Sequence, residues 1–412
     1  TTSGRPGIYS GAVRFYTAPL HFLHSHPMKI SEVTTPADAA AFIRFPIRLY
    51  RGDPNYLQPL DKDIKAVFDP KENKFFRHGQ CTRFLLRDND GQVIGRIAAF
   101  INDRLAKKES QPTGGCGFFE CIHDQAAANL LFDNARDWLA ARGMEAMDGP
   151  INFGERDAWW GLIVEGFDPP PYKMNYNPPY YRELFESYGF QIYFQQWCYS
   201  LKVANRLQEK FYARHAAIRE NPDYRAEHLR KSRLEKYAED FRTVYNKAWV
   251  KHGAGKELES RQVQGFFRKM KPVIDELAIW YVYYKNEPVA MWVNLPDINQ
   301  LFGRFKGKFG LLEKLRFVWM LKRRKTNKFI GLVFGIVPEH QGKGVDSFMI
   351  VEGASVIQGK KLYEDFEMQW IGDFNPKMVA IAESLGTYRS RVLITYRYLF
   401  DRTKPFQRHP IL

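Results

Sequence analysis

The sequence predicts an α+β protein in which two halves of the chain repeat one order of elements around a mixed, mostly antiparallel sheet. Each half contains two β-type runs joined by a short turn of hairpin composition, at 89–91 and at 285–287. Each half continues with an apolar strand and a helix, and it closes with a short helix ended by glycine and a last strand. An element order that occurs twice indicates a duplicated unit.

Composition and charge restrict the class of protein. With 45% hydrophobic and 26% charged residues, the chain has the composition of a soluble globular protein. Its net charge of +15 indicates an anionic partner, such as nucleic acid, a phosphorylated cofactor or a membrane surface. The cysteines lack CxxC spacing, and neither a secretory signal nor a run long enough to span a membrane is present. We therefore expect a cytoplasmic protein with reduced thiols and no metal site.

The first domain is expected at 28–203, after a flexible N-terminal tail or leader at 1–27. Regular patterning begins with a strand at Met28, and Pro36 stands at the start of a helix, where its missing N–H is tolerated. After the hairpin, strands are expected at 117–122, 144–152 and 191–203, and helices at 126–143 and 180–189. A long loop rich in aromatic residues, proline and glycine precedes the second of these helices.

A charged helical connector at 204–224 is expected to lead into the second domain at 225–412. The predicted elements of this domain are helices at 238–249, 347–361 and 376–386, a hairpin at 277–295, and strands at 329–337, 362–374 and 391–400. The order matches that of the first domain, which supports the duplication.

Residues 337–345 read VPEHQGKGV and lie between an apolar strand and an apolar helix. A glycine-containing turn at this place offers backbone amides without Cβ obstruction, next to the positive end of a helix, and Lys343 adds a charge. These are properties of a phosphate-binding loop. An ordinary strand-to-helix turn explains the same residues about equally well.

This stretch resembles the pyrophosphate-binding motif of the GCN5-related N-acetyltransferases, the GNAT superfamily, because Gln341 and Gly344 match its pattern. The resemblance implies a tandem GNAT fold and binding of acetyl-CoA or a longer acyl-CoA. Asp346 departs from the pattern, because a small residue is usual there and a carboxylate near phosphates costs binding energy. The cofactor-binding residues implied by the motif are Ile336, Val337, Gln341, Gly342, Lys343, Gly344 and Val345.

The stretch NPKMVAIAESLG resembles the helix that follows in this family, and Asn375 matches the residue that contacts the cofactor arm. The tyrosine that many members use to protonate the leaving thiolate is absent, but Tyr388 is close enough in sequence to replace it; a core aromatic is the simpler interpretation. The first half shares this helix pattern at Asn177 but has no glycine loop, so we expect it to form the acceptor side and not to bind CoA.

The catalytic base and the acceptor pocket are predicted from the residues themselves. Transfer to an amine requires a group that takes a proton. Glu367, on one face of a strand, and Asp373 are the candidates, although a solvated strand face explains Glu367 as well. The aromatic loop is expected to contain the acceptor-binding residues, with a plug between the halves as the alternative. These residues are Glu155, Arg156, Trp159, Trp160, Tyr176 and Asn177.

Residues 304–328 form a basic insertion with ten lysines or arginines and one glutamate. As a helix, its apolar residues Leu311, Leu312, Leu315, Val318 and Trp319 share one face. Such a helix lies on an anionic membrane or packs on its own domain, and no base-stacking motif supports nucleic acid.

The function predicted from the sequence is therefore that of a CoA-dependent N-acyltransferase that moves an acetyl or longer acyl group to an amine, with a lipidic amine at the inner membrane surface as the candidate acceptor. Two other functions remain open: a GNAT-fold protein that binds a ligand or membrane without catalysis, and a transferase that uses aminoacyl-tRNA.

Overall fold

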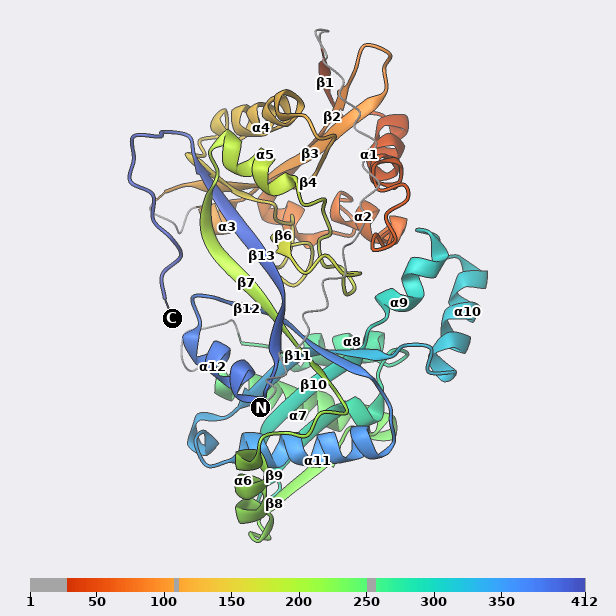
Figure 1. Cartoon of the computed structure of the whole chain (residues 1–412), viewed down its shortest axis with the longest axis vertical. Helices are drawn as coiled ribbons and strands as arrows, with labels where there is room; N and C mark the ends of the chain where they lie inside the picture. Colours follow the sequence, from red (N-terminus) through yellow and green to blue (C-terminus); the bar gives the residue numbers. More distant parts are fainter. Residues whose placement is uncertain (1–27, 107–110, 250–256, 412) are drawn as a thin grey trace, which may run out of the picture.

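The computed structural model describes residues 28–106, 111–249 and 257–411. The tail expected at 1–27 lies outside the described residues. Across the described residues the strands join into one 13-stranded sheet in the order β1-β2-β3-β4-β5-β13-β7-β12-β11-β10-β9-β8, with β6 added on β13. Figure 1 shows the two halves above and below a crossing of long strands in the middle of the molecule.

The strands of the first half are β1 (Lys29–Glu32), β2 (Gly79–Arg87), β3 (Val93–Asn102), β4 (Thr113–Cys121), β5 (Ala146–Gly149), β6 (Leu162–Glu165) and β7 (Gln191–Lys202). Those of the second half are β8 (Tyr224–His228), β9 (Ile279–Tyr284), β10 (Glu287–Pro296), β11 (Lys328–Ile336), β12 (Asp365–Gly372) and β13 (Tyr388–Leu399). The predicted strands are all present.

The two halves exchange their last strands. β13, from the end of the chain, lies between β5 and β7 of the first half, and β7 in turn pairs with β12 of the second half. The two exchanged strands are antiparallel neighbours across the centre of the molecule (Figure 1). Because of this exchange, each half of the sheet is completed by a strand from the other half.

Both predicted hairpins form, and their turns have the backbone conformation that their residues favour. Lys285 and Asn286 have φ values of 48° and 68°, as expected of the two central residues in a type I′ turn, and Gly91 has a φ of 76°. The β2–β3 and β9–β10 pairs are antiparallel with the register that these turns set. Local turn chemistry therefore determines the register at both places.

The helices of the first half are α1 (Pro36–Leu49), α2 (Asp61–Val67), α3 (Asp103–Ala106), α4 (Gln125–Ala140) and α5 (Tyr181–Tyr188). Those that follow are α6 (Glu209–Arg219), α7 (Leu234–Ala248), α8 (Ser260–Met270), α9 (Asn299–Phe302), α10 (Leu311–Lys322), α11 (Val345–Gly359) and α12 (Pro376–Ser384). Pro36 opens α1 as predicted, Asp124 caps α4, and Gly189 ends α5 with a φ of 109°.

Each half of the sheet has its own large hydrophobic core. In the second half, aromatic residues of β9 and β10 pack against α7 and α11, and Gly353 of α11 allows the indole rings of Trp280 and Trp292 to approach its backbone. In the first half, α4 and α5 cover β3 and β4 around Phe132 and Phe185. These cores fix the positions of β11 and α11, between which the glycine loop runs.

Six helices and strands of the described chain lie outside the patterns recognised in the sequence: β6, β8, α2, α3, α8 and α9. β6 lies within the aromatic loop and pairs with β13. The helices α2 and α8 likewise had no predicted counterpart, because each occupies a polar stretch between stronger signals.

Candidate functional site

The strands β11 and β12 begin as a parallel pair and then separate. They pair from Lys328 with Asp365 to Gly331 with Met368, and the rest of β11 makes no pairs with β12. A β-bulge lies at the point of separation, because Asn294 of β10 pairs with Gly331 whereas Val293 pairs with Val333. Leu332, the extra residue, has no ladder partner on either side and is 38% exposed. Backbone polar groups of β11 are thus presented at an opening in the sheet.

The glycine loop connects this opening to α11. Ile336 ends β11, Val337 is buried with its N–H bonded to the carbonyl of Val289, and Val345 begins α11. Gly342 and Gly344 have φ values of 71° and 84°, a region that side chains with a Cβ rarely adopt.

Lys343 and Gln341 are exposed, and the Gln341 amide donates to the carbonyl of Ile336 at 3.0 Å. The loop therefore places a cation and the unpaired amides of a helix N-terminus next to the parted strands, which suits an anion. Asp346 is half-buried in the first turn of α11, so its charge, which is unfavourable to an anion, stays close to the loop.

The corresponding opening in the first half is filled by the chain itself. β4 and β5 also pair only at their start, from Thr113 to Gly115, and β4 carries a bulge where Phe118 has a φ of 49°. The N–H of Ile151 then bonds to the carbonyl of Cys116 at 2.8 Å, and the carbonyl of Ile151 lies 1.8 Å from where a Cβ on Gly117 would be. The two halves thus share one architecture, but only the second half keeps its strands apart.

The helix α6 lies along α11 beside this opening. Phe211 of α6 is buried with Ile350 and Val351 of α11, and Phe334 of β11 and Leu385 border this cluster. At the N-terminus of α11, Arg214 is within 3.4 Å of where a Cβ on Gly344 would be. Consequently α6 packs on α11 beside the glycine loop and near the free end of β11.

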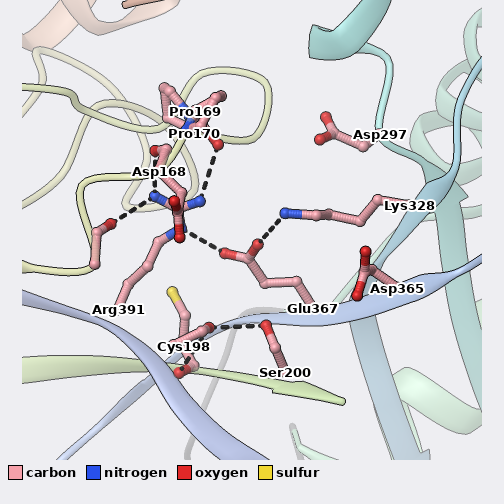
Figure 2. Close-up of polar contacts among 12 residues, drawn as sticks. Asp168, Pro169, Pro170, Cys198, Ser200, Asp297, Lys328, Asp365, Glu367 and Arg391 are labelled. Atoms are coloured by element: carbon pink, nitrogen blue, oxygen red, sulfur yellow. Dashed lines mark hydrogen bonds and ion pairs between the residues drawn. The ribbon is translucent and has the colours of Figure 1, made fainter. Parts of the chain in front are cut away.

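Glu367, predicted as a catalytic residue, lies at the centre of a buried ion-pair cluster (Figure 2). Its carboxylate accepts from Arg391 at 2.8 Å and from Lys328 at 2.9 Å, and it is 2% exposed. The Arg391 guanidinium also donates to the carbonyls of Gly166, Asp168 and Pro169. Glu367 itself is therefore buried and not solvated, whereas Asp365 and Gln369 on the same strand face are half-buried.

Asp297 lies on the other side of Lys328 in this cluster (Figure 2). It is 3% exposed, and burial raises its pKa from 3.8 to about 7, although Lys328 acts in the opposite direction. A carboxyl with a pKa near neutrality has the property required of a general acid or base. It could not be recognised in the sequence, because a lone aspartate at a strand end is a common turn residue.

The remaining residues predicted near the cofactor are separate from this cluster. The Asn375 side chain accepts from the N–H of Met378 and so caps α12. Asp373 is paired with Arg408. Tyr388 begins β13 and is 58% exposed, so it is not the core aromatic that a strand residue usually is.

The aromatic loop encloses one side of an open cavity that lies mainly in the first half and is bordered by Asn299 of α9. Three of the six predicted acceptor residues line it: Trp159, Tyr176 and Asn177. The Asn177 amide is bonded to both backbone groups of Ile163, which fixes the wall. Trp160 is buried in the neighbouring core with Arg156 over its ring, and Glu155 is paired with Lys74 at the surface.

A carboxylate that the sequence reading missed lies at this cavity. Glu120 accepts from the hydroxyls of Tyr50 at 2.6 Å and Tyr181 at 2.9 Å, and Arg96 is at 3.3 Å. Burial raises the pKa of Glu120, while Arg96 and the hydroxyl groups lower it. Its strand reads as an apolar core segment, and only the burial of a charged residue within it could have drawn attention.

None of the helices in the described part of the chain combines the length and apolar character that a membrane crossing requires. Within the same residues, no three His, Cys, Asp or Glu side chains are grouped closely enough to hold a metal ion. The four cysteines, all described, are free thiols.

Comparison with known proteins is consistent with this architecture. The sequence matches no family model. A bacterial ceramide synthase from Caulobacter vibrioides is 28% identical over 377 residues, which are 88% of this chain and 96% of that protein.

Two solved structures share the fold. A tandem GNAT protein from the clavulanic acid biosynthesis pathway matches 92% of this chain and 100% of its own, with a TM-score of 0.51 and 9% identity. A GCN5-related glucosamine N-acetyltransferase region in a fungal multi-domain β-N-acetylglucosaminidase matches 91% of this chain with a TM-score of 0.52 and 10% identity. This chain spans 38% of that longer protein. The tandem GNAT fold predicted from the sequence is thereby confirmed.

Proposed function

We propose that this chain is a CoA-dependent N-acyltransferase that moves an acyl group from a CoA thioester to an amine. The observation that carries the proposal is the opening between β11 and β12, with the Leu332 bulge at its apex and the glycine loop at its mouth. The amides of the loop would hold the pyrophosphate, and the free edge of β11 would pair with the pantetheine arm. The ceramide synthase relative supports the same class of reaction.

In the proposed reaction the amine nitrogen attacks the thioester carbonyl, the carbon–sulfur bond breaks, and the CoA thiolate leaves. A backbone N–H at the Leu332 bulge, where β11 has no partner in β12, would polarise the carbonyl oxygen as charge develops on it. The attacking nitrogen loses a proton and the leaving thiolate gains one, so the site needs groups that exchange protons.

Glu367 is held by two cations, so we assign it a positioning role. We retain Asp373 and Tyr388 as candidates for proton transfer and add Asp297, since its pKa of about 7 suits this task.

We propose further that the acceptor is a lipidic amine bound in the first-half cavity. The cavity is lined by aromatic and apolar side chains together with three carboxylates, Asp61, Asp63 and Glu120, and two cations, Arg96 and Lys173. Because Arg96 is paired with Glu120, Asp61 and Asp63 outnumber the remaining cation, a combination that suits a cationic head with an apolar tail. Ceramide synthesis, the activity for which the Caulobacter relative is named, is acylation of such an amine. This would place the protein in the cytoplasm, at the inner face of a membrane.

The test is an assay of CoA release and of product mass with purified protein. Acetyl-CoA and palmitoyl-CoA would each be offered with a long-chain 2-amino alcohol, a short amine and no acceptor. We expect amide product and stoichiometric free CoA with the long-chain acceptor. Saturable acyl-CoA binding without product from any acceptor would contradict the enzymatic proposal and favour a ligand-binding protein.

A further inference from the structure

The helix α10 presents an apolar face to solvent. Leu311, Leu312 and Leu315 are 75%, 76% and 62% exposed, and Trp319 and Val318 are 54% and 43% exposed. Their spacing of three and four residues places them on one side of the helix. Five large apolar side chains that share one exposed helix face form a patch of the kind that marks an interaction site.

The opposite face of α10 is anchored, so this apolar face does not turn inward. Phe317 and Met320 are buried together with Leu301, Phe302 and Phe305, and the ring of Phe317 stacks on that of Phe302 at 4.9 Å. Because both faces of the helix are apolar and only one is covered by the protein, the exposed face is available for a partner.

Basic side chains surround the apolar face. Of the ten lysines and arginines in 304–328, only Arg324 and Lys328 form ion pairs within the described part of the chain, with Asp275 and Glu367. Glu313, the one acidic residue of the segment, is used to accept from the N–H of Gly310 at 2.8 Å. The positive charge is therefore not neutralised internally.

Part of this charge lines a groove of about 580 Å³ beside α10. Its lining consists of Arg304, Phe305, Lys306, Lys308, Leu312, Glu313 and Arg316. Lys306 and Gly307 both have positive φ, 47° and 79°, and form the tight turn that brings the strip of cations back toward the helix. A concave surface with four cations is chemically suited to a phosphate group.

We propose that residues 304–328 dock on an anionic phospholipid bilayer, with lipid phosphates in the basic groove and the apolar face of α10 inserted among the acyl chains near the headgroups. A nucleic acid would use the cations but would leave the five apolar side chains in water. A bilayer satisfies both, because its headgroups are anionic and its interior is apolar.

The docking surface lies next to the first-half cavity. The N–H of Asp61 bonds to the carbonyl of Gly307 at 2.9 Å, and Gly303 contacts Leu57. Leu57, Asp61 and Asn299 of α9 all line the cavity, and in Figure 1 the helices α9 and α10 project on the side of α2. Membrane docking would deliver a lipidic acceptor to the cavity from the bilayer, and only this last step rests on the proposed function.

The test is co-sedimentation of the full chain with vesicles, a readout that needs no activity. We expect binding to vesicles of equal parts phosphatidylcholine and phosphatidylglycerol, and little binding to phosphatidylcholine alone. Two variants test the surface: the triple substitution Arg304→Glu, Lys308→Glu and Arg316→Glu, and the double substitution Leu315→Glu and Trp319→Glu. Each variant should weaken binding by at least about tenfold. Each basic residue near an anionic surface contributes roughly a factor of five, and the second variant replaces apolar side chains that would insert with anionic ones that the surface repels.

Matched controls come from α8, which is also exposed and basic. The triple substitution Arg261→Glu, Arg268→Glu and Lys269→Glu removes the same charge, and Phe266→Glu removes an exposed ring, so both should leave binding unchanged. At constant ionic strength, inorganic phosphate and glycerophosphate should not displace the protein from the vesicles.

Three results would overturn the proposal. They are no binding of the native protein to anionic vesicles, equal losses in the α8 controls, and binding to an RNA oligonucleotide with none to vesicles. If the native protein binds vesicles but transfers no acyl group between soluble substrates, the proposed function is contradicted and the docking proposal stands.

Discussion

The Arg391 guanidinium donates to the Glu367 carboxylate at 2.8 Å, and both side chains are only 2% exposed. The pair joins β12 to β13, which are both adjacent to β7, and through Arg391 it reaches the carbonyls of the loop at 166–169. It therefore ties the second half to the loop that continues toward the first-half cavity. A buried ion pair of this kind is costly to break, because either partner alone is an unpaired charge in a dry environment.

Glu367→Gln is expected to lower the free energy of unfolding by about 3 kcal/mol or more, since it leaves Arg391 and Lys328 without their carboxylate. The measurement is urea unfolding followed by circular dichroism. Asp365→Asn on the same strand is the matched control, because its partner Lys202 is 61% exposed, and its effect should be below about 1 kcal/mol. Equal stability of Glu367→Gln and the native protein would show that the cluster does not stabilise the fold.

Asp297 is expected to make stability depend on pH between about 4 and 7. Because burial raises its pKa from 3.8 to about 7, the native state binds the proton more tightly than the unfolded chain does. The stabilising contribution of the protonated Asp297 carboxyl is thus fully present below pH 3.8, its ordinary pKa in the unfolded chain. This contribution is lost as the pH rises to about 7, its pKa in the native state.

The variant Asp297→Asn, which cannot ionise, removes this dependence. It should gain stability relative to the native protein from pH 4 to pH 8, by on the order of 4 kcal/mol. Urea unfolding of both proteins across this range measures the difference, and a difference that is constant with pH would refute the raised pKa.

The packing of α6 on α11 predicts an effect on ligand affinity. Phe211 is buried between α6 and α11 close to Phe334 of β11, where the proposed pantetheine arm would lie, so we expect α6 to shift when acyl-CoA binds. Phe211→Ala weakens this packing and should raise the apparent affinity for acyl-CoA about tenfold, because less free energy is needed to displace α6.

Calorimetric titration measures that affinity. Phe267→Ala, which removes a buried ring from α8 instead, controls for general loss of stability and should leave the affinity unchanged. Weaker binding in Phe211→Ala than in this control would mean that Phe211 belongs to the binding surface itself.

The sequence determined the local features of the fold well. Asn286 and Gly91 specify their turns, Gly189 ends its helix, and Gly344 stands where the loop needs a positive φ, because each of these depends on one residue and its neighbours. The tandem arrangement followed from the repeated order of such features.

The exchange of β7 and β13 could not be predicted in this way, since it depends on which distant strand each one meets. The ion pairs of Glu367 likewise join residues from three strands that are far apart in sequence. The opening between β11 and β12 could not be predicted from these residues, because strand separation has no signature in the composition of either strand.

The central claim is that the second half binds acyl-CoA at its glycine loop, and calorimetric titration with acetyl-CoA and then palmitoyl-CoA tests it most directly. The variant Gly344→Val places a side chain at a φ of 84° in the loop, and the control Gly91→Val places one at 76° in a hairpin turn with open space around it. The account predicts saturable binding to the native protein and to Gly91→Val, and none to Gly344→Val. No binding of either donor to folded native protein, or equal binding to both variants, would contradict it.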